Sequence, residues 1–60
     1  MVKIKDLKKG ELFKFNNCVH IVDRPYKNDN KPLLSTIKGA WESNMFHNKE
    51  LKVEKVGENV

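Results

Sequence analysis

Residues 23–32, DRPYKNDNKP, offer almost no side chain that an apolar core would accept, yet they take up a sixth of this 60-residue chain. A domain this small buries barely enough apolar surface to offset the entropy lost when its chain is ordered. Because ordering costs about 1.5 kcal/mol per residue, nearly every large apolar side chain elsewhere must be buried, within the chain or against another subunit. We therefore predict one domain over residues 1–60, with this segment on its surface.

The charge of the chain favours anionic partners, or simply solubility. Twelve basic and eight acidic residues give a net charge of +4, which argues against an acidic mimic of DNA. Eleven of the basic residues are lysines, and only Arg24 offers the planar fork that reads phosphates and guanines with two hydrogen bonds. We therefore expect contact with nucleic acid to involve the RNA or DNA backbone.

The compartment is predicted from what the sequence lacks. Cys18 is the single cysteine, so an internal disulfide is excluded and a reducing cytoplasm fits. The start MVKIKDLKKG has no apolar run typical of a signal peptide, and no segment approaches the roughly 20 apolar residues of a membrane span. We expect a soluble, cytoplasmic protein without a membrane partner.

Alternating apolar residues predict strands from Glu11 onward. Residues 1–10 are predicted to be an N-terminal extended segment and turn. A helix over residues 1–9 is the alternative, but Gly10 would end it, and a helix this short is not stable alone. Two runs then have a period of two, Phe13 with Phe15 and Val19 with Ile21, and together they predict a hairpin.

The register of this hairpin depends on the length of its loop. A two-residue loop at 16–17 sets Phe13 opposite His20, whereas a three-residue loop at 16–18 sets Phe13 opposite Ile21. We predict the longer loop, with an asparagine in the left-handed conformation, because it gathers four apolar side chains on one face. Those side chains are Phe13, Phe15, Val19 and Ile21.

Two further strands follow the polar segment. Residues 33–37 predict a strand with Leu33 and Ile37 on one face and Leu34 on the other. After Gly39, residues 40–46 predict a strand that carries Trp41, Ser43 and Met45 on one face. A helix over 41–48 is the alternative, but its apolar stripe is thin and it has no clear cap.

The last part of the chain predicts a turn, a strand and a tail. Residues 46–50 look like a tight connection, and in the strand at 51–56 Leu51 and Val53 alternate with charged residues. Residues 57–60 are predicted to be a flexible tail.

Five short strands with no helix to cover them bury their apolar face best by closing into a barrel. The fold class is therefore all-β, a five-stranded barrel with a long loop between strands 2 and 3. The segments IKDLKKGELFKF, VHIV, LLSTI, GAW and FHNKELKVEKV resemble the small SH3-like β-barrels, including uncharacterised short proteins of bacteriophages and low-GC bacteria. SH3 domains proper bind proline-rich peptides in an aromatic groove, for which only Tyr26 and Trp41 are counterparts here.

No pattern of catalytic or metal-binding residues stands out. Cys18 and His20 would share a strand face, and His47 and Asp23 could approach them, but the chain has neither CxxC nor a spaced Cys/His set. A cysteine–histidine pair alone lacks an orienting third group, the carboxylates are scattered, and no phosphate loop is present. We predict a non-enzyme without metal or cofactor.

The loop at 25–32 is the main candidate for binding. Pro25 and Pro32 stiffen its two ends, and a basic loop with one aromatic suits phosphates and a stacked base. The alternative is a plain connection with Tyr26 folded back over one end of the barrel. Trp41 is predicted to lie in the core, and it would be a contact for a protein or a base if exposed. The candidate contacts are Arg24, Tyr26, Lys27, Lys31, Lys38 and Trp41.

Two functions fit these residues. The first is a non-enzymatic binding module that contacts nucleic acid or a ribonucleoprotein through the basic loop. The alternative is a phage-type inhibitor or adaptor that acts on a bacterial host protein. A monomer or a small homo-oligomer is expected, because small barrels have exposed edges and little core.

Overall fold

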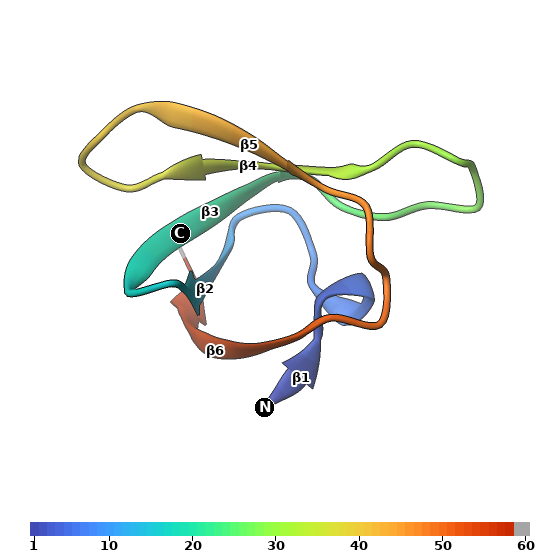
Figure 1. Cartoon of the computed structure of the whole chain (residues 1–60), viewed down its shortest axis with the longest axis horizontal. Coiled ribbons are helices and arrows are strands. Elements are labelled where there is room, and N and C mark those ends of the chain that lie inside the picture. The colour runs from blue at the N-terminus through green and yellow to red at the C-terminus, as the bar shows by residue number, and fades with distance from the viewer. Residues whose placement is uncertain (59–60) are drawn as a thin grey trace.

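The chain forms one antiparallel sheet in a computed structural model that describes residues 1–58 (Figure 1). The strands are β1 (Val2–Lys3), β2 (Glu11–Phe15), β3 (Cys18–Arg24), β4 (Leu33–Ile37), β5 (Glu42–Phe46) and β6 (Lys52–Glu58). A short 3-10 helix, η1 (Ile4–Asp6), follows β1. The prediction of an all-β fold is confirmed.

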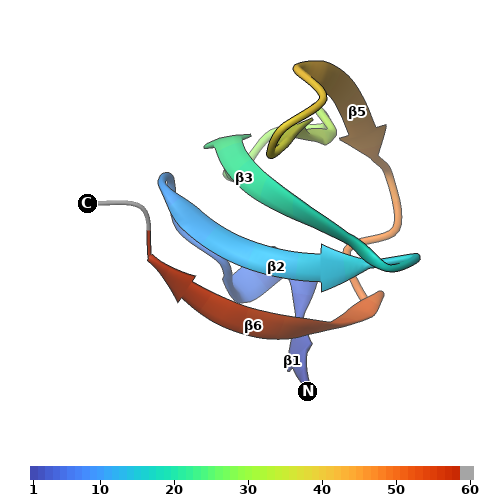
Figure 2. The same ribbon diagram turned by 90° about the vertical axis from the view of Figure 1, so that its left-hand side faces the viewer.

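The sheet is curled but open, with six strands where we predicted five in a closed barrel. Its order is β1-β6-β2-β3-β4-β5, so β1 and β5 are the two edges, and within residues 1–58 they do not pair with each other. Figure 2 shows β6, β2 and β3 bending side by side, with β5 at the far end. The sixth strand is β1, in the segment predicted to be extended. It has two residues because η1 turns the chain away, which leaves it too short to close the sheet.

The β2–β3 hairpin corrects the predicted register. Asn16 and Asn17 form a two-residue turn with φ of 50° and 63°, and positive φ at both positions is what a type I′ turn requires. Phe13 is therefore opposite His20, and the prediction of a three-residue loop is wrong, although an asparagine does supply the left-handed conformation. The prediction failed because it treated His20 as a polar side chain that the core would exclude.

Six apolar side chains form the fully buried core: Ile4, Leu7, Phe13, Val22, Leu33 and Val53. Phe15, predicted on the inward face of the hairpin, and Phe46 are half-buried and pack against it. Because side chains alternate along a strand, Val19 and Ile21 lie on the other face from buried His20. The predicted inward placement of these two residues is therefore wrong.

The later strands agree better with the sequence. β4 has the predicted bounds, with Leu33 buried, and residues 42–46 are a strand and not a helix. β6 extends to Glu58, so Gly57 and Glu58 pair with β2 where we predicted a tail; residues 59–60 lie outside the described part. No helix in residues 1–58 is long and apolar enough to cross a membrane.

The type I′ turn gives a test of the register. In the left-handed conformation a residue with a Cβ loses roughly 1–2 kcal/mol, whereas glycine loses nothing and asparagine is tolerated. We expect Asn17→Ala to lower the free energy of unfolding by about 1 kcal/mol and Asn17→Gly to leave it unchanged or raise it. Urea unfolding followed by circular dichroism measures both. An Asn17→Ala protein as stable as the parent would contradict this turn.

Candidate functional site

The base of the long loop is tied together by Arg24. Its Nη2 donates a hydrogen bond of 2.7 Å to the carbonyl of Pro32, which joins the end of β3 to the start of β4. Nearer the tip, the backbone N–H of Lys31 donates to Oδ1 of Asp29 at 3.1 Å. Arg24, a predicted contact residue, therefore holds the two ends of the loop.

Tyr26 is folded back against the body of the protein. Its ring is half-buried and packs on the core, and its hydroxyl donates a hydrogen bond to the carbonyl of Phe46 at the end of β5. Burial raises the pKa of Tyr26, so its hydroxyl stays protonated at neutral pH. The side chain links the long loop to β5 and forms part of the wall of a hollow.

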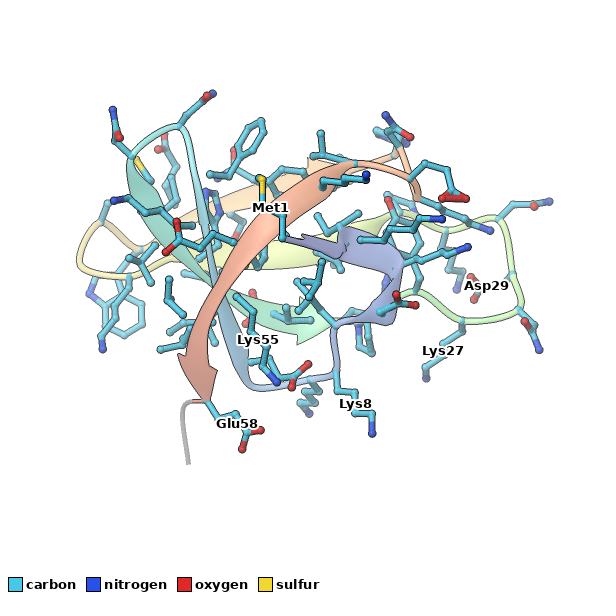
Figure 3. All side chains as sticks on the ribbon, turned by 90° about the horizontal axis from the view of Figure 1, so that it is seen from below. Met1, Lys8, Lys27, Asp29, Lys55 and Glu58 are labelled. Atoms are coloured by element: carbon cyan, nitrogen blue, oxygen red, sulfur yellow. The ribbon has the colours of Figure 1, made fainter. Side chains whose placement is uncertain are left out.

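Lysines from three separate segments line a hollow beside this ring. The hollow has a volume of about 240 Å³ and is lined by Lys5, Tyr26, Lys27, Asn28 and Lys49, which together we call the Tyr26 hollow. Nζ of Lys49 lies 5.8 Å from the centroid of the Tyr26 ring, within the range of a cation–π contact. Figure 3 shows Lys27 on the long loop, well away from Lys55 and Glu58.

The hollow keeps an excess of positive charge. In the described residues 1–58, Glu50 is the one carboxylate paired beside it, with Oε2 3.1 Å from Nζ of Lys3 and Oε1 3.2 Å from Nζ of Lys5. Hydrogen bonds from these two lysines lower the pKa of Glu50, with Lys3 as the largest cause, so Glu50 is ionised at neutral pH. Within residues 1–58, Lys27 and Lys49 have no carboxylate within 4.0 Å.

The remaining predicted contacts lie elsewhere. Lys38 and Trp41 belong to the turn between β4 and β5, at the opposite end of β4 from the long loop (Figure 1). Trp41 is 85% exposed, so its predicted place in the core is wrong. The backbone N–H of Trp41 donates a hydrogen bond to the carbonyl of Ile37, and its φ is +56°, so the residue closes the turn. Lys31 is exposed on the loop. The six predicted contacts therefore form two groups and not one surface.

A second, larger hollow lies beside the aromatic cluster. It has a volume of about 480 Å³, and Phe15, Cys18, His20 and Phe46 are among the residues that line it. The His20 ring stacks on Phe13 with centroids 5.0 Å apart. Its Nδ1 lies 3.0 Å from Oγ of buried Ser35.

His20 is a structural residue in this arrangement. Burial lowers its pKa, so the ring is neutral at neutral pH. No group of three or more His, Cys, Asp or Glu side chains in the described part of the chain could hold a metal ion. Ser35 gives His20 a partner in the core, which the sequence shows only as a polar residue between Leu33 and Ile37.

Sequence reasoning missed Lys5 and Lys49. The N–H of Ile4 donates a 2.7 Å hydrogen bond to the carbonyl of Leu51, and this contact sets η1 beside the turn that precedes β6. That turn carries Lys49, and Tyr26 brings the long loop to the same place. No local pattern marks these lysines, because the cluster is formed by long-range pairing.

A scan against protein-family models gave no match, and searches of the curated proteins and of the solved structures gave none either. We therefore infer function from the geometry of this chain.

The buried histidine predicts a dependence of stability on pH. Its folded pKa lies below the ordinary value of 6.5, so the unfolded chain binds more protons as pH falls through this value. The contribution of His20 is complete above about pH 6.5 and is lost below it. We expect a His20→Phe/Ser35→Ala protein, which removes both partners of the buried pair, to lack this loss.

Urea unfolding between about pH 8 and 5 measures this difference. Glu11 and Glu50 have lowered pKa values, and their contributions are lost only as pH falls below about 4.5, outside this window. Equal pH dependence in the parent and the double variant would contradict a neutral, buried His20.

Proposed function

We propose that the protein is a non-enzymatic binding module, an open relative of the SH3-like barrels, that contacts phosphate groups of RNA or DNA in the cytoplasm, free or in a ribonucleoprotein. The contact surface is the Tyr26 hollow. One observation carries the proposal: Lys5, Lys27 and Lys49 come from three distant segments and line one hollow, and within residues 1–58 only Lys5 of these three is paired with a carboxylate.

The chemistry of the hollow suits a phosphate better than other groups. Ammonium groups attract oxyanions as point charges, and Asn28 can add a neutral hydrogen-bond donor. Exposed Lys31 extends the positive charge along the same loop, which suits a polymer of phosphates more than a single anion. The guanidinium of Arg24, the single arginine, is hydrogen-bonded at the base of the loop, which favours contact with the nucleic-acid backbone over recognition of bases.

The same residues argue against catalysis at this place. Tyr26 remains protonated because its pKa is raised, and its hydroxyl is already bonded to Phe46. The other lining residues are three lysines and an amide. Such a set binds an anion but offers no ready acceptor for a proton.

Salt-dependent binding tests the proposal. The test protein carries Lys5→Gln, Lys27→Gln and Lys49→Gln, and a control with the same charge change carries Lys9→Gln, Lys14→Gln and Lys38→Gln. Fluorescence anisotropy with a single-stranded oligonucleotide gives the slope of log K against log salt. Each lost phosphate contact reduces this slope by about 0.7, so we expect a fall of about 2 for the test protein and little change for the control.

Three results would contradict the proposal. The parent could fail to bind RNA and DNA at low salt, or the two triple variants could lose the same affinity, which would mean that net charge alone drives binding. A host protein captured in place of nucleic acid, and retained after nuclease treatment, would favour the inhibitor or adaptor alternative. Circular dichroism of both variants checks that the fold is intact.

A further inference from the structure

The β5 edge of the sheet is unprotected. Edge strands usually carry lysine, proline or a bulge, or are very short, which prevents pairing with other chains. The other edge, β1, has two residues, one of them Lys3. β5 has five residues without lysine or proline, its one charged side chain is Glu42 at the start of the strand, and it pairs with β4 in an unbroken register. Both Figure 1 and Figure 2 show its outer side open.

The same edge exposes large apolar side chains. Met45 on β5 is 61% exposed, and Trp41, directly before the strand, is 85% exposed. The left-handed backbone at Trp41 costs a non-glycine residue roughly 1–2 kcal/mol. Neither packing within the chain nor backbone preference accounts for a tryptophan at this position. Contact with another chain along β5 would account for both exposed residues.

We propose that β5 pairs antiparallel with β5 of a second copy, around a two-fold axis at Asn44. Two-fold contacts use one patch twice, so the strand must be complementary to itself. In this register Ser43 lies opposite Met45 of the second copy, and Glu42 lies opposite its Phe46. No like charges face each other, and the backbone groups on the open side of both strands gain partners.

The flanking residues and charges fit the same register. Trp41 of each copy comes opposite His47 of the other, so an exposed aromatic ring gains an aromatic neighbour. The Tyr26 hydroxyl bonds Phe46 at the far end of β5, so the two Tyr26 hollows lie at opposite ends of the paired strands. This separation limits repulsion between two chains that each carry a net charge of +4. The pairing does not depend on phosphate binding.

Sedimentation equilibrium over a range of concentrations tests the pairing with charge-swapped variants. A Ser43→Lys/Met45→Lys chain sets lysine opposite lysine at two places, and a Ser43→Glu/Met45→Glu chain does the same with glutamates. We expect each variant alone to dissociate at least about tenfold more readily than the parent, because like charges then face each other. An equimolar mixture is expected to form the 1:1 heterodimer, which also shows that both variants fold.

A control with Val56→Lys, which changes an exposed apolar residue on β6, should dimerise like the parent. Trp41 is the only tryptophan, so its emission should shift to the red when the parent is diluted and the dimer separates. A parent that is monomeric at all usable concentrations overturns the proposal. The β5 edge would then be a site for pairing with a strand of another protein. A dimer that both charged variants retain overturns it as well, because it would use another surface.

Discussion

The turn at Asn16 and Asn17 fixes which side chains the sheet can bury. Positive φ at both residues allows one hairpin register, and a slip of one residue would send every side chain of β3 to the opposite face. The observed register directs His20 and Val22 inward. The core of so small a chain therefore includes a histidine, and the rest of the sheet must supply its partner.

That partner connects the core to the candidate site. Oγ of Ser35 on β4 is the hydrogen-bond partner of Nδ1 of His20, so these two buried polar groups offset the cost of each other's burial. The ring also meets Phe46 edge to face, with centroids 5.5 Å apart, at the end of β5. The carbonyl of Phe46 accepts the hydroxyl of Tyr26, around which the lysines gather. The hairpin register and the position of the long loop are thus linked through one aromatic cluster.

The sequence predicted those features that neighbouring residues determine, and it did not predict those that depend on contacts between distant segments. Alternation predicted β4 with its observed bounds, and it predicted a strand over 40–46 of which residues 42–46 form β5, because both periods are carried by neighbouring residues. It failed at the hairpin, where burial of His20 depends on Ser35, fifteen positions away. The loop composition pointed to one end of the molecule, but Lys49 reaches that end only through tertiary pairing. Trp41 lies on the surface because it takes the left-handed conformation in the turn before β5, which the composition of the sequence does not show.

The central claim is that binding takes place at the Tyr26 hollow while the opposite turn takes no part in it. Titration of the ¹⁵N-labelled protein with a short single-stranded oligonucleotide, followed by amide chemical shifts, tests this most directly. We expect the largest shifts at Lys5, residues 27–28 and Lys49. They should weaken as salt is added, and residues 38–41 should stay unchanged. Large shifts at residues 38–41, with none around Tyr26, would contradict it.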